Sequence, residues 1–369
     1  MGIVKKILKS HAAAAFRAAL LAIVLGLIFG FIVMLAASPA NAVSGILTVI
    51  TGGFGKLADV FYYATPIMMT GLAVGFAFKM GLFNIGASGQ YTMGMFFALY
   101  AGFILPLPAA LEGARWVVCV IAGALGGFIW GFIPGVFKAL LNVNEVITSI
   151  MFNYIGMYLV DMLIMQSPVM YSADKTRTQY LPGAAQLPSM GVTGSNLNIS
   201  IIFAIIFAVL LYVILNKTTF GYELRASGFN KNAAKYAGMN ERRNIILTMS
   251  IAGALAGLGG AFAILAPSTI AGSSMTYEPV SVIAANGFNG IAVALLGASD
   301  PIGIIFSALF ISLIQRGGTL ASLWGYKPEI IDVVVAVIIY FSAFSAAMSL
   351  YFGKLFSRRR DKSKKEGEV

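Results

Sequence analysis

The apolar run AALLAIVLGLIFGFIVMLAA at residues 18–37 decides the fold class. Its length of about 20 residues is what an α-helix needs to cross the hydrocarbon core of a bilayer. Of the 369 residues, 59% are hydrophobic and only 11% are charged, and the mean hydropathy is +0.87. A soluble domain has about a quarter charged residues. The composition therefore excludes a water-soluble enzyme and predicts an all-α polytopic membrane protein.

Other apolar stretches of spanning length follow the first one and predict about ten transmembrane helices. A basic N-terminus (1–17) precedes the predicted transmembrane domain (18–350), and a basic tail (351–369) follows it. The first run also resembles a signal peptide, but its length favours an uncleaved first helix. The expected spans lie near 18–37, 62–79, 90–105, 116–137, 146–165, 198–215, 244–265, 280–298, 301–318 and 329–350.

Most of the 25 Lys and Arg residues lie in three clusters: the N-terminus, the loop at 216–243 and the C-terminal tail. Basic clusters beside membrane spans mark the cytoplasmic side. The sequence therefore predicts a multi-pass protein with both termini inside, and it places the loop at about 166–197 outside. The positive charge is explained by topology and by contact with membrane lipid, so no nucleic-acid partner is expected.

The chain lacks the residues for most catalytic sites. Its single cysteine, Cys119, and single histidine, His11, cannot form a Cys/His metal site or a catalytic triad. The nearest approach to an ATP-binding loop is Gly55-Lys56, but Ile50 stands where the first glycine is needed and Leu57 follows the lysine. We therefore expect no cofactor and no enzymatic activity, and any ATP hydrolysis must come from a partner.

A glycine-rich polar segment interrupts the apolar sequence at residues 79–90, which read KMGLFNIGASGQ. Backbone that leaves a helix at membrane depth must be buried in protein or line a cavity. The segment therefore predicts a broken helix at a substrate pathway, and an ordinary cytoplasmic turn is the alternative.

Two further groups of polar residues fall in predicted spans. On a helix, Glu145, Thr148, Ser149 and Asn153 lie within an arc of about 140°, and such an arc faces the bundle interior or a water-filled path. Glu145 can instead cap its helix. Near residue 288, amide side chains must bond another helix or a ligand, because an unpaired amide in hydrocarbon is costly.

The loop at 216–243 has the sequence signals of a short helix. Asn230 can cap it, residues 231–237 can form two turns, and Gly238 stands where a helix ends. In the spans, glycines repeat every fourth residue from Gly123 to Gly135, which predicts close packing between helices of the same chain.

Three stretches together resemble the permease subunits of bacterial ABC importers in the ribose/branched-chain amino acid class, and within it the nucleoside permeases served by basic membrane lipoproteins. The first stretch is GLAVGFAFK at 71–79 with GLFNIGASGQ at 81–90. The second is NEVIT at 144–148 with Asn153-Tyr154. The third is GYELRA at 221–226, followed by Gly228, Asn230, Ala233-Ala234 and Ala237-Gly238, and then AGALAG at 252–257.

This resemblance implies a division of labour. Two permease chains, often non-identical, form the pathway for a nucleoside, an ABC ATPase subunit docks inside on a coupling helix near 230–238, and an extracellular substrate-binding lipoprotein delivers substrate. The expected pathway residues are Phe83, Asn84, Ser88, Gln90, Glu145, Asn153, Asn286, Phe288 and Asn289. The expected coupling residues are Glu223, Arg225, Gly228, Asn230, Ala233, Ala234 and Gly238.

Two positions depart from the family pattern. Ser88 stands where an acidic residue is expected, which puts a carboxylate role there in doubt, and Lys231 replaces a proline after Asn230. Two alternatives remain open. The same family includes sugar and branched-chain amino acid permeases, and a stand-alone secondary transporter would need no ATPase.

Overall fold

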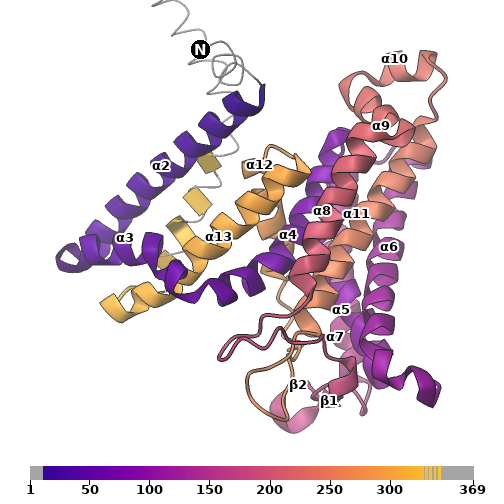
Figure 1. Cartoon of the computed structure of the whole chain (residues 1–369). Coiled ribbons are helices and arrows are strands. Elements are labelled where there is room, and N and C mark those ends of the chain that lie inside the picture. Colours follow the sequence, from indigo (N-terminus) through magenta and orange to yellow (C-terminus); the bar gives the residue numbers. More distant parts are fainter. Residues whose placement is uncertain (1–10, 328, 331, 335, 338–339, 342–369) are drawn as a thin grey trace, which may run out of the picture. The chain divides into compact units, whose positions relative to one another are not determined.

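The computed structural model describes residues 11–327, 329–330, 332–334, 336–337 and 340–341, and these are mostly helical (Figure 1). Nine of the predicted spans coincide with helices. The predicted span at 329–350 falls largely outside the described residues, as does the basic tail. The nine helices are α2 (His11–Ala37), α4 (Leu57–Lys79), α5 (Ala87–Phe103), α6 (Arg115–Leu141), α7 (Glu145–Met165), α8 (Ser200–Lys217), α11 (Glu241–Ile264), α12 (Ala285–Leu296) and α13 (Pro301–Ala321).

Within the described residues, seven helical stretches are long and apolar enough to cross a membrane. Helices α5 and α12 are shorter, at 17 and 12 residues. The prediction of ten full-length spans is therefore not confirmed. Two of the predicted stretches form the short helices α5 and α12. The seven are Leu20–Ala37, Pro39–Lys79, Ala109–Leu141, Glu145–Met165, Ser200–Lys217, Glu241–Ile264 and Pro301–Trp324.

Several smaller elements lie between these helices. Helices α3 (Ala42–Thr51) and α9 (Thr219–Phe229) were not expected from the sequence, whereas α10 (Lys231–Tyr236) was. Strands β1 (Tyr171–Ser172) and β2 (Arg177–Thr178) form an antiparallel pair in the register Tyr171↔Thr178. The 3-10 turns are η1 (Pro39–Asn41), η2 (Gly52–Lys56), η3 (Ala109–Ala114), η4 (Ala173–Lys175), η5 (Gly183–Ala185) and η6 (Ser322–Trp324).

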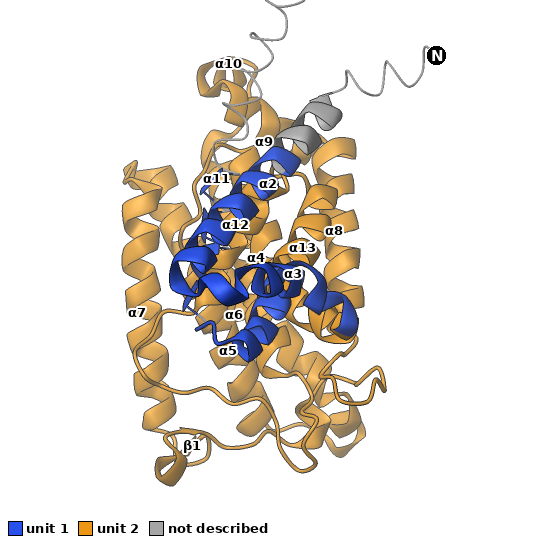
Figure 2. Cartoon of the chain, turned by 90° about the vertical axis from the view of Figure 1, so that its left-hand side faces the viewer, with its two compact units in different colours: residues 1–55, 313–369 blue, residues 56–312 orange. Residues whose placement is uncertain are grey.

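The chain divides into two compact units, coloured separately in Figure 2: a central unit at residues 56–312, and a terminal unit at 1–55 and 313–369. In the terminal unit, the Trp324 indole nitrogen donates to Thr48 Oγ1 over 2.9 Å, and the Tyr326 hydroxyl donates to the Ser38 carbonyl over 2.9 Å. These bonds join the segment around residues 38–48 to the segment at 324–326 within that unit.

Helix α11 lies at the core of the central unit, where it packs against α4, α5 and α6. The glycine row of α6 faces α11: a Cβ built on Gly127 would collide with the backbone of Gly253 and Gly257. The predicted packing between helices of the same chain is confirmed. Glycines let these two backbones approach more closely than any side chain would permit.

Four helices start at polar side chains that accept a hydrogen bond from the first turn. They are Asn144 before α7, Thr218 before α9, Asn230 before α10 and Asn240 before α11. Such caps satisfy backbone N–H groups that have no partner within the helix. The caps define where the helices begin, so polar residues at the ends of apolar runs set the lengths of these helices.

The predicted outer loop is an ordered connection between α7 and α8. Its backbone bonds the segment that follows α11: Thr178 N–H donates to the Tyr277 carbonyl over 2.9 Å, and Leu187 N–H donates to the Leu265 carbonyl over 2.8 Å. The loop and the segment at 265–284 therefore cover the same end of the central unit.

Candidate functional site

The candidate site starts where α4 stops. Gly81 has φ +75°, its N–H donates to the Phe78 carbonyl, and Leu82 N–H donates to the Ala77 carbonyl. These two bonds form a Schellman motif, which needs a residue in the left-handed region and so favours glycine. The apolar sequence is interrupted here as predicted: α4 ends at Lys79, and α5 begins at Ala87 after a turn in which Leu82, Asn84 and Gly86 are buried and Gly81 is exposed. This geometry fits a broken helix and an ordinary turn alike.

Asn84 and Gln90 form a closed pair across this break. Asn84 Nδ2 donates to Gln90 Oε1 over 2.9 Å, and Gln90 Nε2 donates to Asn84 Oδ1 over 3.1 Å. Each residue is only 1% exposed. Two buried amides that bond each other satisfy half of their hydrogen-bonding capacity.

Asn153 of α7 joins the start of α5 to the preceding turn. Its Oδ1 accepts from Gly89 N–H over 2.7 Å, and its Nδ2 donates to the Ile85 carbonyl over 3.0 Å. The side chain is buried. Its amide bonds one backbone N–H and one carbonyl that have no partner within a helix, because the helix is interrupted here. Asn153 is a positioning residue for the Asn84–Gln90 pair in this arrangement.

Three more polar bonds fix the start of α12 to α5 and to α4. Ser88 Oγ donates to the Ala284 carbonyl over 2.7 Å, and Asn286 Nδ2 donates to the Tyr91 hydroxyl over 3.0 Å. Thr70 Oγ1 donates to the Asn286 carbonyl over 2.8 Å. An acidic residue at position 88 would turn a carboxylate toward a carbonyl oxygen, so serine suits this contact.

The other expected pathway residues do not bond this cluster. The Phe83 ring lies 5.0 Å from the Phe78 ring, centroid to centroid. Glu145 is ion-paired with Lys138 over 2.8 Å, and Asn144 instead of Glu145 caps α7. At the start of α12, Phe288 is exposed and Asn289 is half-buried.

Some residues of the site were not among the expected ones. Tyr91 and Thr70 bond Asn286, and each could have been noticed as a polar side chain inside an apolar span. Ser149 is fully buried beside Gly86, and its hydroxyl has no hydrogen-bond partner among the described residues. Ser149 lay in the expected polar arc but was not taken as a site residue.

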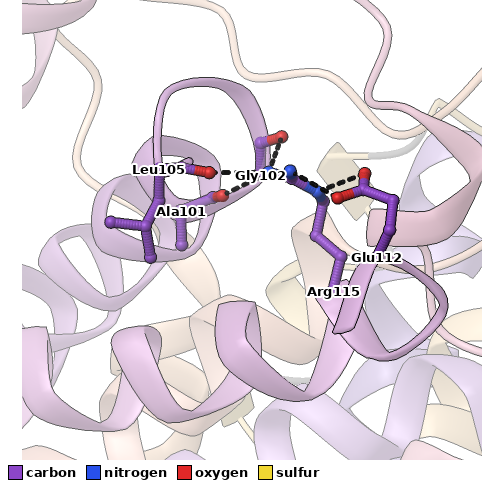
Figure 3. A network of polar contacts seen from close by, with 5 residues as sticks. All are labelled: Ala101, Gly102, Leu105, Glu112 and Arg115. Atoms are coloured by element: carbon purple, nitrogen blue, oxygen red, sulfur yellow. Dashed lines mark hydrogen bonds and ion pairs between the residues drawn. The ribbon is translucent and has the colours of Figure 1, made fainter. Parts of the chain in front are cut away.

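The far end of α5 is fixed by an arginine from the next helix (Figure 3). One guanidinium nitrogen of Arg115 donates to the carbonyls of Ala101, Gly102 and Leu105, over 3.2, 3.3 and 3.0 Å. The other two bond the Glu112 carboxylate, each over 2.8 Å. The last carbonyl groups of a helix have no hydrogen-bond donor within the helix. Arg115 donates to the carbonyls at the end of α5, so both ends of α5 are held.

Asp161 of α7 binds the segment that leads into α12. Its carboxylate accepts from the Tyr277 hydroxyl over 2.6 Å and from Ser281 N–H over 2.8 Å. Burial of the ring and then the neighbouring carboxylate raise the pKa of Tyr277. The phenol therefore stays protonated and continues to donate, and Asp161 ties this segment to α7.

The expected coupling residues lie on two adjoining helices, α9 and α10. Asn230 caps α10 as predicted, with Ala233 N–H donating to its side chain over 3.1 Å, and Gly238 ends it with φ +79°. Lys231, the residue in the proline position, lies 3.8 Å from Glu241. The helical form of this loop is thus present, and α9 extends it further than the sequence indicated.

Two of the remaining coupling residues, Glu223 and Arg225, form side-chain hydrogen bonds. Asn244 Nδ2 donates to Glu223 Oε2 over 2.8 Å, and Arg225 donates to Asn216 Oδ1 over 3.3 Å. Ala234 is buried and Ala233 is exposed. Both alanines line a groove of about 590 Å³ between α9 and α10.

The fold and the site together define a multi-helix membrane permease whose polar centre is built mainly from neutral amides and hydroxyls. In the described part of the chain, no group of three or more His, Cys, Asp or Glu residues could hold a metal ion. Residues 56–343 match the family described as branched-chain amino acid transport system/permease component, and the chain belongs to this family.

Several characterised proteins are similar to the chain over most of its length. The guanosine ABC transporter permease protein NupP of Bacillus subtilis is 38% identical, covering 91% of this chain and 95% of its own. The nucleoside permease protein NupB of Lactococcus lactis is 36% identical, covering 95% and 96%. The glucose permease protein TsgB13 of Haloferax volcanii is 29% identical, covering 89% and 87%.

A second Bacillus subtilis protein also matches. NupQ, another guanosine ABC transporter permease protein of the same strain as NupP, is 28% identical and covers 75% of this chain and 86% of its own. No solved structure matches the chain.

Proposed function

We propose that this chain is the permease subunit of a bacterial ABC importer that moves nucleosides into the cell. The observation that carries the proposal is the 36–38% identity, over nearly the whole chain, to two permeases named for guanosine and nucleosides. The neutral amides and hydroxyls around the broken helix suit the ribose and base of a nucleoside, because they donate and accept without needing a charged ligand.

Asn84, Gln90 and Asn286 are the proposed contacts for substrate in the pathway, and Phe83 and Phe288 offer rings for the base. Asn153 and Ser88 hold the helix ends that carry these groups. Contacts of this kind are weak enough to release substrate once the pathway opens to the other side.

The end of the central unit with α9 and α10 is the proposed cytoplasmic side, in agreement with the basic residues there. Two aromatic side chains on these helices are almost fully exposed: Phe229 at 95% and Tyr236 at 94%. Exposed aromatics beside a groove are typical of a protein interface. They are the proposed docking surface for the ATPase subunit, with both chain termini on the same side of a bacterial cell membrane.

The opposite end, with the ordered loop at 166–199, is the proposed binding surface for an extracellular substrate-binding lipoprotein. A second permease chain would complete the pathway. Two permease proteins of one strain, NupP and NupQ, are both named for guanosine transport, which supports this arrangement.

The experiment is uptake of labelled guanosine and uridine by cells with and without this chain. Excess unlabelled ribose, glucose, leucine or other nucleosides serves as competitor. We expect deletion to abolish uptake and only nucleosides to compete. Unchanged nucleoside uptake would overturn the proposal.

A sugar importer is the second candidate, because the chain is also 29% identical to a glucose permease. It predicts that glucose or ribose import fails on deletion while guanosine uptake continues. The same uptake assay therefore distinguishes the two candidates.

A further inference from the structure

Helix α5 starts without a capping side chain. The residue before it is Gly86, and in the described part of the chain neither Ala87 N–H nor Ser88 N–H has a hydrogen bond. The first turn of this 17-residue helix is buried. Free N–H groups at the positive end of a helix dipole favour an acceptor oxygen. The start of α5 therefore has donors that the chain itself does not use.

Two side chains of α7, one turn apart, lie against this start. Asn153 accepts from Gly89 N–H, as described above. Ser149 lies one turn earlier on the same face of α7. Its Oγ is 3.3 Å from the position that a Cβ of residue 86 would occupy. The Ser149 side chain is 0% exposed, and its hydroxyl has no hydrogen-bond partner among the described residues.

The unpaired hydroxyl of Ser149 differs from comparable hydroxyls in the same unit. A hydroxyl on a helix can donate to the carbonyl four residues earlier. Thr92 does so over 3.0 Å and Ser250 over 2.8 Å. Ser149 does not, although a buried hydroxyl without a partner costs free energy. A ligand that reaches Ser149 during transport would supply the missing partner.

An acceptor lies on the other side of the same point. Asn84 Oδ1 is also 3.3 Å from the Cβ position of residue 86, so it lies at most 6.6 Å from Ser149 Oγ, twice 3.3 Å. One hydroxyl group that bonds two oxygens bridges up to about 5.5 Å. Asn84 Oδ1 accepts one bond, from Gln90, and a carbonyl oxygen can accept two.

We propose that Ser149 is a further substrate contact, which together with Asn84 and the start of α5 binds a ribose hydroxyl of the nucleoside. The inference rests on the proposed function. A hydroxyl fits because it accepts from Ser149 or a free N–H and donates to Asn84 Oδ1. A carbonyl or an anion would leave Asn84 Oδ1 facing another acceptor. Both side chains are buried in the structure, so the site admits substrate when α7 separates from the turn that carries Asn84.

The test compares substrates that differ by one hydroxyl. Cells with the complete transporter take up labelled guanosine or its 2′-, 3′- or 5′-deoxy analogue. They carry the unaltered chain, Ser149→Ala or the control Ser250→Ala, which removes another fully buried helical hydroxyl. Each substrate is compared between variants, so differences in its capture outside the permease cancel. The level of tagged chain in the membrane reports insertion.

We expect Ser149→Ala to lower guanosine uptake about fivefold, the loss that corresponds to one neutral hydrogen bond. Uptake of the one analogue that lacks the bonded hydroxyl should fall less than about twofold, because this analogue has no bond to lose. Ser250→Ala should affect all four substrates alike. Equal losses for all four substrates in Ser149→Ala, or no loss for any, would overturn the proposal.

The melting temperature in detergent gives a readout that does not depend on the substrate. Ser149→Ala removes an unpaired hydroxyl and should melt at the same or a higher temperature, whereas Ser250→Ala removes a bonded one and should melt lower. A lower melting temperature for Ser149→Ala would show that the hydroxyl is bonded within the folded chain, and would overturn the proposal. If deletion of the chain leaves guanosine uptake unchanged, the nucleoside assignment fails, and the melting temperatures decide on Ser149 alone.

Discussion

Gly228 of α9 lies directly against the backbone of Lys79, the last residue of α4. A Cβ built on Gly228 would collide with the Lys79 carbonyl oxygen, and one built on Gly81 would lie 3.6 Å from the Gly228 carbonyl. Because Gly228 has no side chain, α9 reaches the turn that carries Asn84. The proposed docking surface for the ATPase and the polar centre of the permease are therefore connected through one backbone contact.

Gly228→Ala is the first prediction. Even one methyl group must push α9 away from the turn, and overpacking at such a contact costs about 1–3 kcal/mol. We expect nucleoside uptake to fall by about tenfold, the factor that corresponds to 1.4 kcal/mol, while ATP hydrolysis by the assembled transporter continues.

The control for this variant is Gly183→Ala, where a Cβ meets nothing within 4 Å. Uptake and ATP hydrolysis are measured on both variants in membrane vesicles. An equal ratio of nucleoside uptake to ATP hydrolysis in the two variants would show that the Gly228–Lys79 contact does not couple ATP hydrolysis to transport.

The positions of the helices could be predicted from the sequence because membrane spans depend on long apolar runs. Two short helices mark the limit of this approach. The run near 280–298 is long enough to span, but its first part is not helical. Ser281 has φ +55° and bonds Asp161, and α12 begins only at Ala285. A hydropathy pattern cannot show a tertiary bond that stops a helix.

The second prediction concerns the Asn84–Gln90 pair. Asn84→Leu or Gln90→Leu leaves a buried amide without its partner, which costs about 1–3 kcal/mol. We expect both single variants to insert but to lower uptake and thermal stability.

The double variant separates substrate contact from structure. Replacing both amides by leucine leaves no unpaired partner, so the loss of stability should be smaller than the sum of the single losses. Uptake should still be lost, because the polar groups are gone. A double variant with normal uptake would assign the pair a purely structural role. Detergent melting curves and uptake rates provide the two measurements.

Sequence patterns identified the polar residues of the site better than their partners. Asn84, Gln90 and Asn153 stood out as amides in an apolar context, and the structure brings them together. That Tyr91 would bond Asn286, 195 positions away, is a matter of tertiary packing. Glu145 was expected in the pathway, but it forms an ion pair with Lys138 in the last turn of α6. Local sequence shows which side chains need partners but not which partners they find.

Arg115 provides the third prediction. Arg115→Lys keeps the charge but replaces a planar fork by a single ammonium group, which cannot bond the carbonyls at the end of α5 and Glu112 together. We expect the melting temperature in detergent to fall by several degrees, of the order found for losing a helix-end contact. Glu112→Gln is the matched control, and it should have a smaller effect because the bonds to the α5 carbonyls remain. Equal melting temperatures for Arg115→Lys and the unaltered chain would contradict the capping role.

The contact between Asp161 and Tyr277 gives the last prediction. The pKa of Tyr277 is raised in the folded chain, so the contribution of its neutral phenol is fully present below the ordinary value of about 10. It is lost only as the pH rises through the higher folded value. The contact should therefore be unaffected between about pH 6 and 9.

Asp161→Asn weakens the contact at every pH, because an amide cannot accept as strongly as a carboxylate from both Tyr277 and Ser281. Limited chymotrypsin cleavage within residues 266–284 is the measurement. We expect several-fold faster cleavage in Asp161→Asn across this pH range, as for a segment that has lost a charge-assisted bond. Neutralising an exposed carboxylate away from the cleaved segment by Asp174→Asn should leave the cleavage rate unchanged. If both variants are cleaved alike, Asp161 does not hold this segment, and something other than its carboxylate fixes the start of α12.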